Sequence, residues 1–94
     1  MITIHFYNTK QMNIFFLLIN REFGLTRKLI VETLLIPRTT VYDNLEVLMR
    51  KGLVKYYTKK TSKKGRPTVY FYINPIIKQE FFKQQIPQIK LNFN

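Results

Sequence analysis

Residues 37–73 decide the fold of this chain, and they read PRTTVYDNLEVLMRKGLVKYYTKKTSKKGRPTVYFYI. In the first third of this stretch, apolar residues recur at helical spacing, and a Lys-Gly pair then ends the pattern. Two runs rich in β-branched and aromatic residues follow at 53–59 and 68–73, with a lysine-rich loop that contains glycine between them. The stretch therefore predicts a short helix followed by a two-stranded antiparallel hairpin.

Two more helices are expected upstream. The first begins after a cap at Asn8 or Thr9 and runs to about Glu22, with Gly24 just beyond it as a stop signal. Its apolar residues face the core; they are Met12, Phe15, Phe16 and Ile19.

The second upstream helix begins after Thr26 as its cap and runs to about Leu34. Pro37 then marks the first turn of the third helix, where a missing N–H costs nothing. The two residues between them, Leu35 and Ile36, are few enough to force the sharp angle of a helix-turn-helix.

The two ends of the chain carry weaker signals. Asn74-Pro75 predicts the start of a fourth helix that runs to about Gln85. Its apolar residues form either plain core or a dimer seam, and we favour the seam; they are Ile77, Phe81 and Phe82. Residues 1–7 and 89–93 alternate apolar with other residues and predict short strands that pair within one chain or across a dimer; frayed ends are the alternative.

The 94 residues predict a single domain whose charge favours a polyanionic partner. A net charge of +11 from 16 basic and 5 acidic residues points to DNA, RNA or an anionic membrane. Eight of these basic residues and no acid fall within 50–66; they are Arg50, Lys51, Lys55, Lys59, Lys60, Lys63, Lys64 and Arg66. A hairpin that lysines merely keep soluble is the alternative, but such surfaces usually mix charges of both signs.

Several classes of function are disfavoured. The chain has no cysteine, one histidine (His5) and only scattered acids, so we expect no enzyme, no metal site and no cofactor. The longest apolar run, residues 14–19, is far shorter than the roughly 20 residues that span a bilayer. We expect a cytoplasmic protein without a membrane partner, and no small-molecule ligand can be identified.

The third helix presents a polar face opposite its apolar stripe, which consists of Val41, Leu45 and Leu48. Threonine, asparagine and aspartate side chains can bond base edges, although capping explains one such residue at a helix start. We therefore expect this face to bind DNA; its residues are Arg38, Thr39, Thr40, Tyr42, Asp43 and Asn44.

The hairpin loop supplies a second candidate contact. Arg66 lies between Gly65 and Pro67, and a guanidinium held at such a tip suits a narrow minor groove. Lysines suit phosphates, and those expected to contact DNA are Lys59, Lys60, Lys63 and Lys64. An ion pair between Arg66 and Glu46 is the alternative.

The order of these motifs resembles the winged-helix regulators of the MarR, ArsR and PadR type and their archaeal and viral relatives. The resemblance covers about residues 10–74 and rests on Leu25-Thr26, on 34–45, on Lys51-Gly52-Leu53-Val54 and on Gly65-Arg66-Pro67 before 69–72. It implies a homodimer whose third helices enter adjacent major grooves while the wings reach the flanking backbone or minor groove. One departure is Leu35, where such proteins often have glycine, so the turn must either avoid a left-handed backbone there or hold Leu35 under strain.

These observations together predict an α+β winged helix-turn-helix, a three-helix core with a two-stranded wing over residues 8–74 and an extra C-terminal helix and tail over 75–94. The expected function is sequence-specific regulation of transcription by a homodimer that binds double-stranded DNA, with Arg27 and Lys28 of the second helix on the backbone. The alternatives are an architectural or replication protein with little base preference, and a protein or RNA interaction module.

Overall fold

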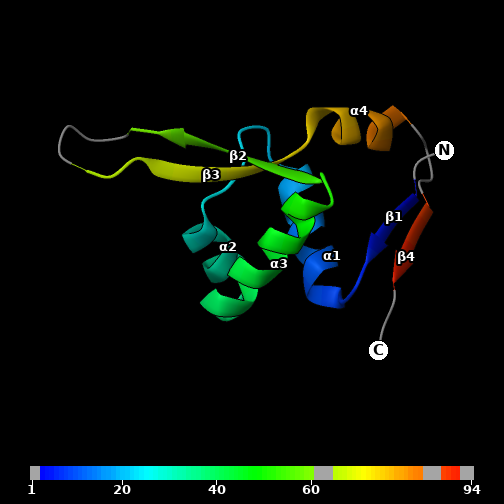
Figure 1. The fold of residues 1–94 in the computed structure, drawn as a ribbon, viewed down its shortest axis with the longest axis horizontal. Helices are drawn as coiled ribbons and strands as arrows, with labels where there is room; N and C mark the ends of the chain where they lie inside the picture. The colour runs from blue at the N-terminus through cyan, green and yellow to red at the C-terminus, as the bar shows by residue number, and fades with distance from the viewer. Residues whose placement is uncertain (1–2, 61–64, 84–87, 92–94) are drawn as a thin grey trace.

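Three helices and a β-hairpin form the body of the molecule, as shown by a computed structural model that describes residues 3–60, 65–83 and 88–91. The hairpin β2–β3 lies across helices α1–α3 and projects beyond them as a wing (Figure 1). This is the α+β winged helix-turn-helix that the sequence predicts. The elements are β1 (Thr3–Phe6), α1 (Thr9–Ile19), α2 (Arg27–Leu34), α3 (Arg38–Arg50), β2 (Val54–Lys59), β3 (Thr68–Ile73), α4 (Pro75–Lys83) and β4 (Gln88–Leu91).

The core forms where the apolar stripes of the helices meet. Val41 and Leu48 of α3 are fully buried and Leu45 is 1% exposed, so the predicted stripe of α3 is confirmed. Ile30 of α2 is also fully buried. Side chains of α1, both wing strands and β1 complete the same cluster; they include Phe6, Ile14, Phe15, Leu18, Val54, Phe71 and Ile73.

The predicted caps of α1 and α2 are confirmed. The Asn8 side-chain oxygen accepts a hydrogen bond from the Gln11 N–H at 2.8 Å, and Thr26 Oγ1 accepts one from the Leu29 N–H at 3.2 Å. Each satisfies one of the backbone donors that the first turn of a helix leaves without a partner. Pro37 was expected in the first turn of α3. It occupies the cap position instead, and the helix starts at Arg38.

The predicted end of α1 is wrong. The helix ends at Ile19, three residues before Glu22, and Gly24 does not stop it. Gly24 has a φ of 83°, and a Cβ there would collide with the carbonyl oxygen of Phe71. Glycine is needed because the next residue, Leu25, exchanges two backbone hydrogen bonds with Phe71, at 2.8 and 2.9 Å, and so forms an isolated β-bridge to β3.

The turn between α2 and α3 holds Leu35 in the left-handed region, with φ 55° and ψ 40°. The absence of glycine therefore leaves a strained backbone at this position rather than a different turn, at a cost of roughly 1–2 kcal/mol. The Leu35 side chain is 86% exposed, so its packing does not offset the cost of this backbone conformation.

The two chain ends pair with each other within one chain. Strands β1 and β4 form a parallel two-stranded sheet beside α1 at the end of the molecule opposite the wing (Figure 1). Lys51 attaches β1 to the end of α3: its Nζ donates to the His5 carbonyl at 2.8 Å and lies 3.7 Å from the ring centroid of Tyr7. Desolvation by burial lowers the pKa of Lys51 from its ordinary value.

Helix α4 begins as predicted, with the Asn74 side chain accepting from the Ile76 N–H at 3.1 Å. It is described as far as Lys83, and residues 84–85 lie outside the described part. Its apolar residues divide into two sets. Phe81 packs on Phe15 and Phe16 at ring distances of 6.0 and 6.1 Å, and Ile77 also packs on the core, although both stay partly exposed. Phe82 and Ile76 are 59% and 69% exposed.

Candidate nucleic-acid interface

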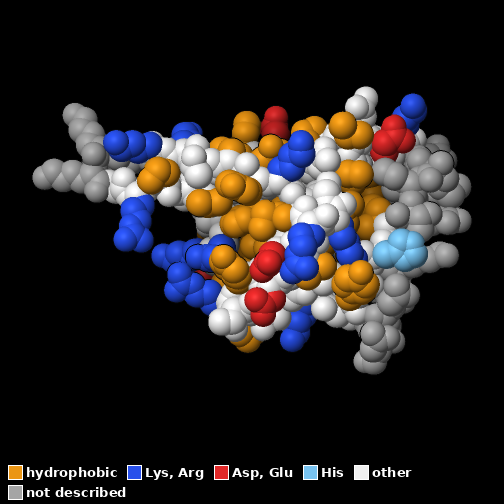
Figure 2. Space-filling model, in the orientation of Figure 1, with side chains coloured by type: hydrophobic (Ala, Val, Ile, Leu, Met, Phe, Trp, Pro, Cys, Tyr) orange, Lys and Arg blue, Asp and Glu red, His pale blue; other side chains and the backbone are white. Residues whose placement is uncertain are grey.

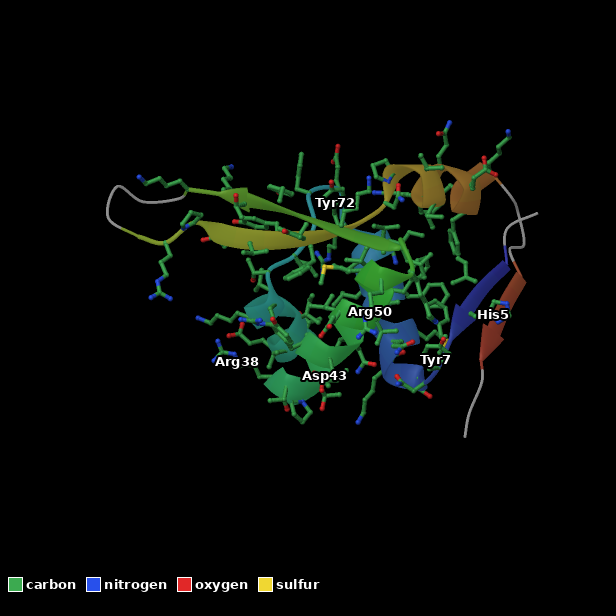
Figure 3. The ribbon with its side chains drawn as sticks, viewed as in Figure 1. His5, Tyr7, Arg38, Asp43, Arg50 and Tyr72 are labelled. Atoms are coloured by element: carbon green, nitrogen blue, oxygen red, sulfur yellow. The ribbon has the colours of Figure 1, made fainter. Side chains whose placement is uncertain are left out.

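The outward face of α3 presents the polar residues that the sequence singles out. Arg38, Thr39, Tyr42 and Asp43 are exposed, and Thr40 is half-buried. They lie opposite the buried stripe, in the first turns of a helix whose last turn leads into the wing. Arg38 and Asp43 appear on the same lower side of the molecule in Figure 3. This face offers hydroxyl, guanidinium and carboxylate groups to a partner.

Asn44 does not belong to this face, and its expected place there is corrected. Its side chain is only 7% exposed. Its amide nitrogen donates to the Thr40 carbonyl at 2.8 Å, and its oxygen accepts from Asn8 Nδ2 at 3.3 Å. Both ends of the amide are therefore engaged inside the protein, and we leave Asn44 out of the interface.

Helix α2 adds positive charge beside the start of α3. Lys28 is exposed, and the Arg27 guanidinium lies 4.9 Å from the ring centroid of Tyr42. That contact brings a predicted backbone-contacting residue next to a predicted base-reading residue. Figure 2 shows the resulting cluster of blue side chains below the wing.

The wing carries a second group of cations. Lys59, Lys60 and Arg66 are exposed on its described part, and Lys63 and Lys64 lie outside the described residues. Glu46, the alternative partner for Arg66, forms an ion pair with Arg50 at 3.3 Å instead.

The basic run of residues 50–66 is not one patch. Arg50 pairs within α3, and Lys51 is turned towards β1 and the chain end. Lys55 lies opposite Tyr72 in the hairpin, on the face of the sheet that does not meet α3. Because these three belong to different surfaces, the candidate interface takes its cations from α2, from Arg38 and from the outer half of the wing.

A recess of about 730 Å³ separates the wing from α2 and α3. No pocket was expected from the sequence. The recess arises because side chains alternate along a strand, which turns Tyr56, Val69 and Phe71 towards the helices. In the sequence, this alternation was the only feature that could have predicted the recess. Its remaining lining is apolar at the floor and charged at the rim and includes Val31, Leu45, Met49, Arg27, Lys28, Arg38, Glu32 and Glu46.

Two further observations apply to the described residues alone. Among them, no three His, Cys, Asp or Glu side chains gather where they could hold a metal ion. Their helices are all too short or too polar to cross a bilayer.

Several solved structures share this fold. A transcriptional regulator homologue from Pyrococcus horikoshii OT3 superimposes with a TM-score of 0.63 at 24% identity, over 81% of this chain and 72% of that one. Lactococcus lactis ZitR gives 0.63 at 20% identity, and MepR from Staphylococcus aureus 0.58 at 23%, over 83% and 82% of this chain. The chain spans about half the length of these two, 52% and 55%. At such identities the likeness shows the fold alone.

The sequence itself shows the family. The comparison with curated proteins found no match. Residues 8–76, from the cap of α1 to the start of α4, match the family described as sugar-specific transcriptional regulator TrmB. The match covers all three helices of the core, the turn with Leu35 and both wing strands. With the exposed polar face of α3 and the cationic wing, it identifies the chain as a member of the TrmB family of transcriptional regulators.

Proposed function

We propose that the protein is a cytoplasmic, homodimeric regulator that binds double-stranded DNA in a sequence-specific manner. Members of its family regulate transcription and are not enzymes. The observation that carries the proposal is the set of exposed groups. The polar face of α3 is accompanied by exposed cations of α2, of the start of α3 and of the wing, and the whole chain has 16 basic against 5 acidic residues.

Each element has a separate role in this proposal. Thr39 and Asp43 contact base edges in the major groove, because a hydroxyl or a carboxylate can select a base there. Arg27, Lys28 and Arg38 contact phosphates, which position the protein without reading sequence. Arg66 enters or follows the neighbouring minor groove from the wing. A twofold pair of such units would read two half-sites about one helical turn apart.

The test begins with selection of bound duplexes from a random pool. A regulator should enrich one motif, and a homodimer should give that motif twofold symmetry. Thr39→Ala and Asp43→Ala should then each cost about 1–3 kcal/mol on the selected site and relax preference at one base step per half-site. Affinity for random duplex should change little, and Glu80→Ala on α4 serves as the control.

One outcome favours a different function. Equal losses on selected and random duplexes, with unchanged melting temperature, would mean that α3 only positions the protein. An architectural DNA-binding role with low base preference would then replace the regulator. Failure to bind any duplex in a salt-sensitive manner would contradict both, and would favour the interaction-module alternative.

A further inference from the structure

The wing sheet has a second face, and of its residues the proposed duplex interface uses Lys59 alone. Side chains alternate along each strand, so Lys55, Tyr57 and Lys59 of β2 share one side with Tyr70 and Tyr72 of β3. We call this side the outer wing face. The opposite side, with Tyr56 and Phe71, lines the recess towards α2 and α3.

Three tyrosines on the outer wing face form a row of rings, the tyrosine ladder. Tyr57 and Tyr70, which are opposite each other in the hairpin, stack with centroids 5.2 Å apart and only 12° between their planes. Tyr72 lies against Tyr57 at 5.7 Å on the side nearer the helices. The next pair towards the tip, Lys59 and Thr68, adds no ring, so the ladder can accept a further ring at that end.

The ladder is held in place before any partner arrives. The Tyr57 hydroxyl donates to the Phe23 carbonyl at 2.8 Å, which fixes the central ring to the loop after α1. Phe23 itself is 73% exposed beside it. A preset ring loses little conformational freedom when another ring stacks on it, which favours binding.

The charge of the face selects the class of partner. Lys55 and Lys59 are exposed on either side of the ladder, and β2 and β3 contain no acidic residue. Tyrosine pairs across a hairpin also stabilise the ribbon by themselves. Stabilising the hairpin requires no lysine beside the tyrosines. A partner with flat rings and phosphates requires both the tyrosine rings and the lysines.

We propose that the outer wing face binds single-stranded nucleic acid. An unpaired base stacks on the open end of the tyrosine ladder next to Lys59, and Lys59 and Lys55, one at each end of the ladder, contact phosphates of the same strand. Aromatic platforms flanked by cations bind single strands with little sequence preference, because every base has a π-face. A paired base inside a duplex cannot reach the ladder. Tyr72 lies on the sheet well apart from Arg38 and Asp43 (Figure 3), so the ladder is separate from the polar face of α3, although both sites use Lys59.

The test uses end-labelled oligo(dT) and oligo(rU) of about 12 nucleotides, a length within the range of one small binding site. Anisotropy should show binding of at least one of them, and the pair distinguishes DNA from RNA. Tyr70→Thr should lower that affinity about 5- to 150-fold, and Tyr70→Phe should restore it. Tyr56→Thr, on the opposite face of the same hairpin, is the matched control and should keep single-strand affinity. Binding should also quench tyrosine emission, which can be followed directly because the chain has six tyrosines and no tryptophan.

Lys55→Gln provides a second measurement that does not disturb the rings. It should make the slope of log K against log salt shallower by about 0.7 for the single strand and leave the duplex slope unchanged. Circular dichroism should show that every variant is folded. Unchanged single-strand affinity in Tyr70→Thr, or equal losses in Tyr70→Thr and Tyr56→Thr, would overturn the proposal. Duplex binding is measured in parallel, so this result is independent of the regulatory function proposed above.

Discussion

At the scale of single residues, Asn44 shows how a polar group on a reading helix serves the fold. It connects the cap of α1 to the first turns of α3 through Asn8 and the Thr40 carbonyl. Because Asn8 also caps α1, its side chain joins the two helices at a single point. The start of α3, where Thr39 and Asp43 project outward, is fixed relative to α1 by this contact.

Asn44→Ala should therefore destabilise the protein without changing its base preference. The substitution leaves the Asn8 amide without its acceptor in a partly buried position, so the free energy of unfolding should fall by about 1–3 kcal/mol. Chemical denaturation measures that loss, and the ratio of selected-site to random-duplex affinity should stay constant. Asn13→Ala, on the exposed side of α1, should be nearly neutral. A changed base preference with unchanged stability would return Asn44 to the interface.

Leu35 is the residue where the backbone stores strain. Leu35→Gly removes the steric cost of the left-handed conformation but adds entropy to the unfolded chain, roughly 0.5–1 kcal/mol. The balance predicts a rise of up to about 1 kcal/mol in the free energy of unfolding, visible as a higher melting temperature. Glu32→Gly inside α2 should have the opposite sign, with a loss of about 0.5–1 kcal/mol. A loss of the same size in both variants would show that Leu35 carries no strain.

At the scale of secondary-structure elements, the two faces and the tip of the hairpin have different roles. The inner face closes the recess against α2 and α3, and the outer face holds the tyrosine ladder. The tip carries cations.

Wing lysines should supply affinity without specificity, because lysines that bind phosphates release counterions and read no sequence. Replacing Lys63 and Lys64 together with alanine should weaken selected and random duplexes alike. The slope of log K against log salt should become shallower by roughly 0.9 for each phosphate that the variant no longer neutralises. Lys83→Ala at the end of α4 should leave the slope unchanged. An unaltered slope in the wing variant would remove the tip from the duplex interface.

At the scale of the whole molecule, the wing and the chain ends lie at opposite ends of the longest dimension, which is 45 Å (Figure 1). A dimer formed through α4 and the terminal sheet would leave both wings pointing outward, where they can reach flanking DNA. The exposed side chains available for this contact are Ile76 and Phe82, since Phe81 packs on Phe15 and Phe16.

The two phenylalanines of α4 should therefore respond differently to a charge. Phe82→Glu should yield a folded monomer in sedimentation experiments, because it places a carboxylate in the proposed apolar seam at a side chain that is 59% exposed and packs on Phe81 rather than on the buried core. Phe81→Glu should lower the free energy of unfolding by several kcal/mol, because its ring packs on the core in each chain. A wild-type protein that is monomeric at micromolar concentration would contradict the dimer.

The sequence alone determined the type and order of the elements. Helical spacing, strand alternation, the caps at Asn8, Thr26 and Asn74, and the Lys-Gly stop are local signals, because each arises between residues close together in the chain. The same local chemistry identified the exposed polar residues at the start of α3. These features needed no knowledge of how the elements pack.

Tertiary structure decided the features that depend on residues distant in sequence. It buried Asn44 against Asn8, engaged Lys51 with His5, and used Gly24 for a close approach to Phe71 rather than as a helix stop. The recess and the tyrosine ladder likewise depend on the strand register and on which face of the hairpin meets the helices. The physical reason is that the residue type determines which groups a side chain can bind. Only the packing of the folded chain determines which partner that side chain contacts and how far it is exposed to solvent.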